Sequence, residues 1–151
     1  MDIKKIEPKD CSEAAELAVQ LWKRTAREEI IQEFLDIIQS DEGVIYLGME
    51  DGRAVGFAQC QLRHDYVEGT RTSPVGYLEG IFLLRAYRGK GRAEQLLSAC
   101  EEWAAGKGCR EFASDCEISN EASLKFHLKS GFQEANRIIC FTKPLQEHDG
   151  E

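Results

Sequence analysis

The chain has 151 residues and a formal net charge of −8, from 27 acidic and 19 basic side chains. This length favours one domain with a substantial core, which we place at residues 1–145, followed by a disordered tail over 146–151. The acidic balance argues against nucleic-acid binding, because phosphate backbones require a basic face. It suits a polycationic small molecule attracted over long range.

Targeting and membrane segments are absent from the sequence pattern. The N-terminus has no apolar core of a signal peptide, and no run approaches the roughly 20 apolar residues of a membrane span. We therefore expect a cytoplasmic protein without membrane association. The six cysteines form no C-x-x-C pair and sit mostly in apolar segments, which favours buried free thiols and no metal site: Cys11, Cys60, Cys100, Cys109, Cys116 and Cys140.

The first half of the chain predicts one strand, two helices and a hairpin. The strand covers residues 2–8 and ends at Pro8. Apolar residues at helical spacing from Asp10 to Trp22 predict the first helix, and a similar stripe predicts a second through Ile30, Ile31, Phe34, Ile37 and Ile38. Strands over 43–50 and 53–63 are joined at Asp51-Gly52, a strong hairpin signal.

The second half predicts alternating strands and helices. A polar loop over 64–74 leads into a buried strand over 75–84, and the helix over 92–107 has the clearest apolar stripe. A strand over 109–116, a helix over 119–130 and a final strand or hairpin from 131 to 145 complete the order. The prediction is an α+β fold with a mixed, mostly antiparallel sheet flanked by helices.

A turn rich in glycine and cations separates the buried strand from the long helix. Helix N-termini present N–H groups to phosphate, and glycine lets the backbone approach closely. The sequence matches neither G-x-G-x-x-G nor the P-loop. Phosphate binding and a turn of solvated cations are therefore both open for Arg88, Gly89, Lys90, Gly91, Arg92 and Ala93.

The order of motifs around this turn resembles a known superfamily. R-G-K-G-R-A follows the strand EGIFLL and precedes a long helix, a strand, an S-N-E-A-S helix and K-S-G-F. This order resembles the GNAT superfamily of acetyl-CoA-dependent N-acetyltransferases over nearly the full chain. SPVGYLEGIFLL, EFASDC and GFQEANRI are similar to its aminoglycoside 6'-N-acetyltransferases. The resemblance implies acetylation of an aminoglycoside 6'-amine, antibiotic resistance and a homodimer.

The same resemblance implies where acetyl-CoA binds. The glycine turn would hold the pyrophosphate, and a splayed strand pair would hold the pantetheine through the backbone of Ile81, Phe82 and Leu83. An N–H near Phe82 would polarise the thioester carbonyl. Asn120 matches an asparagine that contacts coenzyme A, although it also fits a helix N-cap.

Acetyl transfer to a protonated amine requires a base. Glu79 is the first candidate, because it lies in an apolar strand, on the face of Tyr77 and Ile81, where an unpaired carboxylate is costly. An ion pair with an arginine is the alternative. Asp115 is the second candidate, with strand termination or helix capping as its alternative. His127 replaces the tyrosine that protonates the thiolate in many members and could donate a proton near neutral pH, although a lone histidine on a helix is more often structural or solvated.

The resemblance also implies substrate contacts, which together with Glu79 and Asp115 comprise Trp22, Thr25, Tyr66 and Asn136. Ordinary packing is an equal alternative for Trp22. Thr25 and Asn136 stand where some members carry a histidine and an acidic residue. Two other functions stay open: acetylation of a polyamine or protein amine, and a non-catalytic acyl-CoA-binding sensor.

Overall fold

The computed structural model describes residues 1–23 and 26–146 and confirms the α+β class. Five strands form one sheet in the order β1-β2-β3-β4-β5, antiparallel except for the parallel pair β4–β5. In chain order the elements are β1 (Asp2–Lys5), η1 (Pro8–Asp10), α1 (Cys11–Trp22), α2 (Arg27–Ser40), β2 (Gly43–Glu50), β3 (Arg53–Arg63), β4 (Val75–Leu83), η2 (Arg85–Tyr87), α3 (Arg92–Gly106), β5 (Phe112–Ala113) and α4 (Glu121–Lys129).

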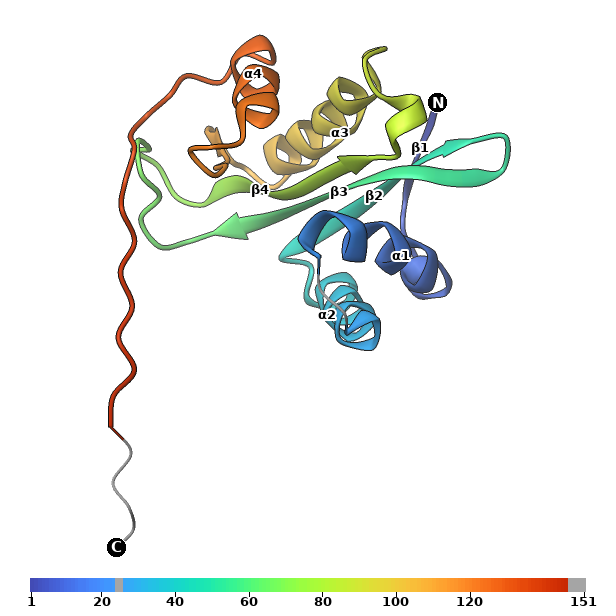
Figure 1. Ribbon diagram of the computed structural model, residues 1–151, viewed down its shortest axis with the longest axis horizontal. Helices are drawn as coiled ribbons and strands as arrows, with labels where there is room; N and C mark the ends of the chain where they lie inside the picture. Colours follow the sequence, from blue (N-terminus) through green and yellow to red (C-terminus); the bar gives the residue numbers. More distant parts are fainter. Residues whose placement is uncertain (24–25, 147–151) are drawn as a thin grey trace, which may run out of the picture.

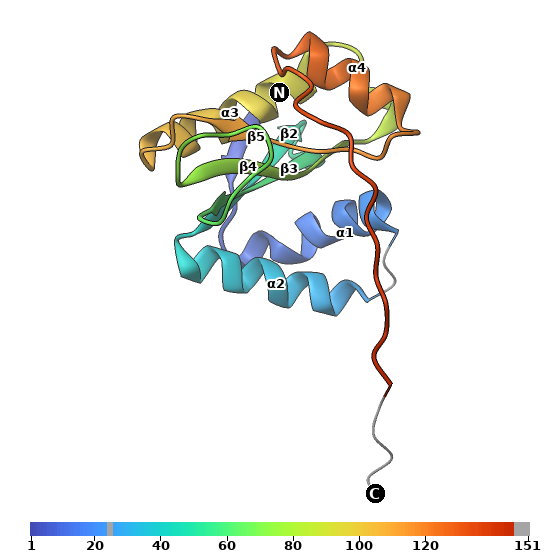
Figure 2. The ribbon, with the colours of Figure 1, turned by 90° about the vertical axis from the view of Figure 1, so that its left-hand side faces the viewer.

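Helices cover both faces of the sheet. α1 and α2 lie on one face, and α3 and α4 lie on the other (Figures 1 and 2). Ile30 and Phe34 of α2 pack with Phe57 of β3, and none of the three has exposed surface. On the other face, Leu96 and Cys100 of α3 are equally buried. The amphipathic patterns therefore correctly predict these two cores.

The β2–β3 hairpin has the predicted turn. Asp51 and Gly52 both have positive φ, 51° and 77°, as a type I′ turn requires. A left-handed conformation is tolerated by Asp and favoured by Gly, so this pair closes the hairpin without strain.

Two predicted strands near the C-terminus differ in the structure. The strand expected over 109–116 contains only Phe112–Ala113. The final strand or hairpin over 131–145 is wrong: Phe132 packs against Phe112, with ring centroids 6.2 Å apart, but residues 133–146 form neither helix nor strand and are exposed. This C-terminal arm, residues 133–146, runs away from the sheet (Figure 1), and within the described part of the chain none of its residues pairs with a strand. Most of the expected tail, residues 147–151, lies outside the described residues.

A β-bulge interrupts the pairing of β3 and β4. Gln59 is opposite Gly80 and Cys60 is opposite Leu78, so Glu79 is the extra residue of β4. Ile81 consequently packs with Leu78 on the α3 face. The expectation that Glu79 shares a face with Ile81 is wrong, because the extra residue reverses the alternation beyond it.

Candidate functional site

The sheet opens where β4 and β5 diverge. Their pairing is limited to Gly76–Phe112 and Tyr77–Ala113, and the rest of that edge of β4 has no strand partner among residues 1–23 and 26–146. The Leu84 N–H donates to Val55 at 2.8 Å on β3. Alternation along an antiparallel ladder then directs the backbone of Phe82 toward β3, and that of Ile81 and Leu83 toward the open edge.

The glycine turn lies at the N-terminus of α3. Gly89 and Gly91 have φ of 85° and 79°, and a Cβ on either would meet no atom within 4 Å. The first helical bond is donated by Gln95 to Gly91 at 3.1 Å. The N–H groups of the preceding turn therefore have no acceptor within the helix. This open, left-handed turn next to unpaired helix amides fits a phosphate-bearing group.

The cations of the turn have different partners. Arg92 donates to both carboxylate oxygens of Glu50 on β2, and this ion pair lowers the pKa of Glu50 and raises that of Arg92. Arg88 donates to the Leu83 carbonyl at 2.8 Å. Lys90 and the turn glycines are exposed, and Ala93 is half-buried against the α3 core. Two of the cations thus anchor the turn to the sheet.

Glu79 forms an ion pair with Arg63, the last residue of β3. Arg63 donates from Nε to Oε2 at 3.1 Å and from Nη2 to Oε1 at 2.9 Å. The hydrogen-bonded carboxylate raises the pKa of Arg63. The ion-pair alternative for Glu79 is therefore present in the structure, and the carboxylate keeps 20% of its side-chain surface exposed.

Asp115 accepts a hydrogen bond from the Tyr77 hydroxyl. Tyr77 is buried, and burial together with this carboxylate raises the pKa of its phenol well above the ordinary value. Because Tyr77 lies two residues before Glu79 on β4, the two candidate bases are brought to the same part of the sheet.

His127 of α4 contacts two serines. Its Nδ1 lies 2.7 Å from the Ser123 carbonyl, which can only accept, so Nδ1 carries a proton. Its Nε2 lies 2.8 Å from the hydroxyl of Ser114, the residue before Asp115. In the neutral ring Nε2 accepts from that hydroxyl, and in the charged ring it donates. His127 and Ser114 can therefore pass a proton toward the diverging strands.

Trp22 ends α1 beside the β-bulge. A Cβ on Gly80 would lie 2.7 Å from the indole, so only glycine fits there. The ring also packs edge-on against Phe57, with centroids 5.6 Å apart. Trp22 is thus a packing residue that also lies against Gly80, the residue after Glu79. The other predicted contact in this region, Thr25, lies outside the described residues.

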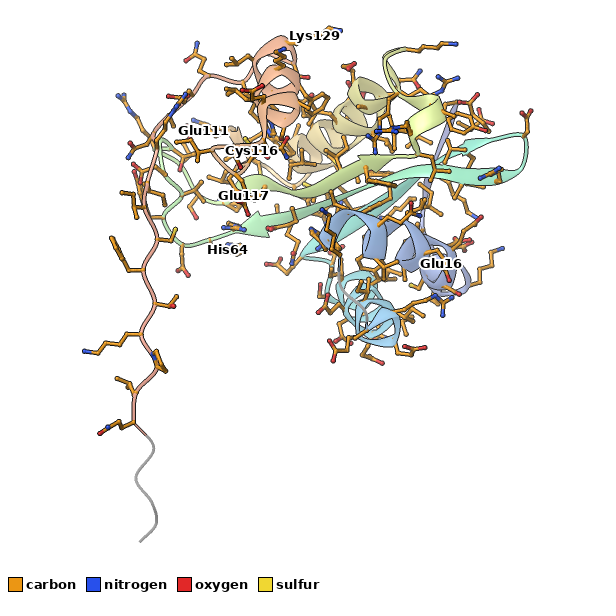
Figure 3. All side chains as sticks on the ribbon, in the orientation of Figure 1. Glu16, His64, Glu111, Cys116, Glu117 and Lys129 are labelled. Carbon is orange, nitrogen blue, oxygen red and sulfur yellow. The ribbon has the colours of Figure 1, made fainter. Side chains whose placement is uncertain are left out.

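The loop over 64–74 carries Tyr66, which is 76% exposed. Glu111 holds the loop: one carboxylate oxygen accepts from the backbone N–H groups of Arg71 and Thr72, both at 2.8 Å. Asn136 donates to Glu68 of the same loop at 2.8 Å. Figure 3 shows Glu111, Cys116 and His64 toward the same end of the molecule.

Asn120 caps α4, since its side-chain oxygen accepts from the Ser123 N–H at 3.1 Å. The N-cap alternative is therefore confirmed, and the amide nitrogen stays available for another contact.

Burial is confirmed for Cys11, Cys60 and Cys100 but is wrong for Cys116 and Cys140, which are exposed. Within the described ranges, no group of three or more His, Cys, Asp or Glu could hold a metal ion.

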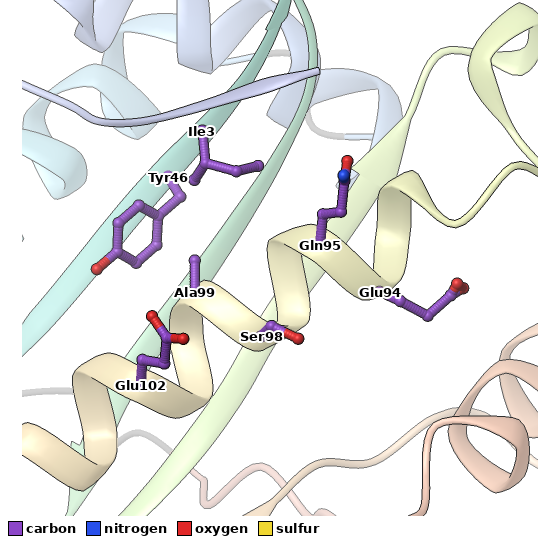
Figure 4. A pocket seen from close by; sticks show the side chains of 7 residues that line it. All are labelled: Ile3, Tyr46, Glu94, Gln95, Ser98, Ala99 and Glu102. Carbon is purple, nitrogen blue, oxygen red and sulfur yellow. The ribbon is translucent and has the colours of Figure 1, made fainter.

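A hollow of about 560 Å³ lies elsewhere, between α3 and the strands β1 and β2 (Figure 4). Its lining includes Glu94 and Glu102 but no cation, so it does not suit a phosphate group. It is also on the face of the sheet opposite Trp22 and Glu79. The candidate site is therefore the divergence of β4 and β5 and not this hollow.

Sequence reasoning did not assign roles to Arg63, Tyr77, Ser114 and Glu68. Arg63 reaches Glu79 only through the register of β3 and β4, which an 11-residue connection does not fix. Ser114 could have been suspected, because it immediately precedes Asp115 at the end of a strand. Glu68 is one of many exposed carboxylates and has no distinguishing sequence signal.

Comparison with known proteins agrees with this geometry. The model of the acetyltransferase (GNAT) family matches residues 10–132. The chain belongs to the GNAT acetyltransferase family. An aminoglycoside N(6')-acetyltransferase type 1 from Salmonella enteritidis is 40% identical, covering 95% of this chain and 99% of the relative. One of the same name from Stenotrophomonas maltophilia is 37% identical, covering 95% and 94%.

Solved GNAT structures have the same architecture. AAC(6')-Iy in complex with a bisubstrate analogue, CoA-S-monomethyl-acetylneamine, has a TM-score of 0.91 and 39% identity, covering 95% of this chain and 98% of that one. AAC(6')-IG from Acinetobacter haemolyticus, without ligand, has a TM-score of 0.90 and 34% identity, covering 97% and 100%. The resemblance noted in the sequence is therefore confirmed at the level of family and fold.

Proposed function

We propose that this GNAT acetyltransferase transfers the acetyl group of acetyl-CoA to the 6'-amine of aminoglycoside antibiotics and so confers resistance. The observation that carries the proposal is the convergence of Glu79 and Asp115 beside the open edge of β4. Paired carboxylates suit a polycationic acceptor amine, and the open edge suits an extended thioester arm. The relatives' names support the substrate class.

The glycine turn and the open edge hold acetyl-CoA in this proposal. The α3 N-terminus and the turn from Arg88 to Ala93 bind the pyrophosphate, and Asn120 adds a polar contact. Ile81 and Leu83 pair with the pantetheine arm, and an N–H on this edge polarises the thioester carbonyl. Phe82 contributes through its neighbours' backbone and not its own, because its N–H points toward β3.

The amine is bound and deprotonated by carboxylates. Glu79 takes the proton of the substrate ammonium, and Asp115 holds the same substrate through its second oxygen. The neutral amine then attacks the thioester directly, without an acyl-enzyme. As the C–N bond forms and the C–S bond breaks, the nitrogen loses its second proton to water. His127, when charged, gives its Nε2 proton to Ser114, whose hydroxyl proton passes to the departing thiolate. Trp22, Tyr66 and Asn136 border the aminoglycoside.

Thiol release from acetyl-CoA tests this function. We expect saturable turnover of the purified protein with kanamycin, tobramycin or gentamicin, and none with spermidine or a lysine peptide. Turnover restricted to the polyamine or the peptide would keep the family activity and reject the antibiotic as substrate. A tight coenzyme A complex without turnover of any amine would favour the acyl-CoA sensor.

We also infer that the protein is a homodimer held together by its C-terminal arms. The arm exposes Ile138, Ile139, Phe141 and Leu145, each by 69% or more of its surface. Exposed apolar groups of this size mark an interaction surface. The arm points away from its own sheet (Figure 2), so its apolar side chains are not covered by that sheet. We infer that a second copy of the chain covers them. In a symmetric dimer each arm would pack against the other copy, and this arm exchange would cover both arms at once.

Light scattering after size exclusion checks the dimer. The full chain should elute at twice its 17.0 kDa mass, and a double change of Ile139 and Phe141 to serine should give a monomer. Lys143→Ser, on the same arm, is the matched control and should stay dimeric. A full-length chain that is monomeric at micromolar concentration would contradict the arm exchange.

The cellular location follows the same proposal, since acetyl-CoA and the ribosome that aminoglycosides attack are cytoplasmic. No helix within residues 1–23 and 26–146 is long and apolar enough to cross a membrane. We accordingly propose a single catalytic domain over residues 1–145 that acts in the cytoplasm.

A further inference from the structure

Arg63 connects the two candidate carboxylates through one series of contacts. Its guanidinium donates to both oxygens of Glu79, at 3.1 and 2.9 Å. Its central carbon lies 3.5 Å from the centre of the Tyr77 ring, and the Tyr77 hydroxyl donates to Asp115. A single cation thus contacts Glu79 directly and reaches Asp115 through one phenol.

The contacts leave both carboxylates able to bind a substrate. An ionised carboxylate has about four acceptor positions. Arg63 occupies one on each oxygen of Glu79, and Tyr77 occupies one oxygen of Asp115. The remaining positions can accept from an ammonium without displacing either internal partner. The internal partners therefore fix the orientation of the acceptors and do not block them.

The orientation of Glu79 depends on Arg63 for a local reason. Glu79 is the extra residue of the β-bulge, so it has no partner across the strands to fix its side chain. The bidentate guanidinium fixes the plane of the carboxylate instead. Tyr77, which lies under the guanidinium, is held among Val67 and Val75 and is only 7% exposed.

We propose that Arg63 is a positioning residue for the acceptor amine: it aligns Glu79 and, through Tyr77, Asp115, so that both accept from one substrate ammonium. This inference rests on the proposed aminoglycoside acetylation. The planar fork is the essential property, because only a guanidinium can bind both carboxylate oxygens while stacking on a ring. Lysine would supply the charge without the alignment.

A purely electrostatic role predicts the opposite result. A cation in an acidic site repels a polycation, so removing Arg63 would then strengthen aminoglycoside binding. Under the positioning role, removal misaligns the acceptors and weakens binding. The direction of the change therefore distinguishes the two.

The experiment compares Arg63→Gln and Arg63→Lys with wild type in steady-state acetylation of kanamycin. Arg53→Gln removes the same charge from the exposed opposite end of β3 and is the matched control. Tyr77→Phe keeps the stacking ring but loses the hydroxyl to Asp115. We expect both Arg63 variants to raise KM for kanamycin about tenfold, the size of a lost charge-assisted hydrogen bond. Tyr77→Phe should raise it less, and KM for acetyl-CoA should stay constant.

The other outcomes overturn the inference. A lower KM in Arg63→Gln would show electrostatic repulsion, and wild-type behaviour of Arg63→Lys would show that charge suffices. Should Arg63→Gln fail to fold, Arg63→Lys and Tyr77→Phe decide alone. If the wild type binds kanamycin but turns over none of kanamycin, tobramycin and gentamicin, the proposed function fails, while calorimetric Kd values for kanamycin still test Arg63. A wild type that binds none of the three aminoglycosides rejects both.

Discussion

Replacing Glu79 with glutamine should lower kcat/KM for an aminoglycoside by about 10²- to 10⁴-fold, the range that removal of a general base produces. Glutamine keeps the shape of the side chain but cannot take the proton of the substrate ammonium. Thiol release at saturating acetyl-CoA measures the loss. Asp115→Asn should lower the same ratio by a smaller factor, because Asp115 holds the substrate and Glu79 removes the proton.

Glu102→Gln on α3 is the matched control for this loss. It removes the same charge from the opposite face of the sheet, beside the hollow of Figure 4, and should retain wild-type kcat/KM. Full activity in both Glu79→Gln and Asp115→Asn would reject the two-carboxylate mechanism. Loss in Asp115→Asn alone would exchange the roles of the two residues.

Replacing Phe57 with alanine should destabilise the protein by about 3–5 kcal/mol, as large-to-small changes in a core do. Phe57 has no exposed surface and contacts two aromatic rings, Trp22 at 5.6 Å and Phe34 at 6.3 Å between centroids. The cavity left by the ring cannot close easily, because β3 is held in the sheet and α1 and α2 are packed against it. Urea unfolding measures the free energy of unfolding.

Phe141→Ala is the matched control for stability within one chain. Its ring is 86% exposed on the C-terminal arm. The substitution should therefore lower the free energy of unfolding of the monomer by less than about 0.5 kcal/mol, when both proteins are compared as monomers. A loss under 1 kcal/mol for Phe57→Ala would mean that the ring is not as closely packed as its burial indicates.

Much of the fold follows from local patterns in the sequence. The stripe of Ile30 and Phe34 predicts α2 and its buried face, because helical periodicity is local. Asp51-Gly52 predicts the hairpin for the same reason, since its turn type depends on two residues. The C-terminal arm shows the limit of this reasoning. Its apolar run at Ile138, Ile139, Cys140 and Phe141 favours a strand, but a strand requires a neighbouring strand, and the sequence does not indicate which chain supplies it.

The candidate site could be predicted only in part. Glu79 and Asp115 stand out because carboxylates interrupt or end apolar segments, which is costly without a function or partner. The contacts of Arg63 and Tyr77 depend on strand register across a long loop, and a bulge shifts that register by one residue. Periodicity assumes a regular strand, so it placed Ile81 on the wrong face.

The extra residue at Glu79 also determines which changes in chain length β4 can tolerate. The two halves of β4 have different roles. The first half holds Tyr77 on one face of the sheet, and the second half directs the backbone groups of Ile81 and Leu83 toward the open edge. Deleting one residue between the two halves would exchange the layers of Phe82 and Leu83 and leave a carboxylate without its arginine. The loop over 64–74 has no strand register to preserve, although Glu111 and Asn136 hydrogen-bond to it. Changes in length should therefore be tolerated better in that loop than in β4.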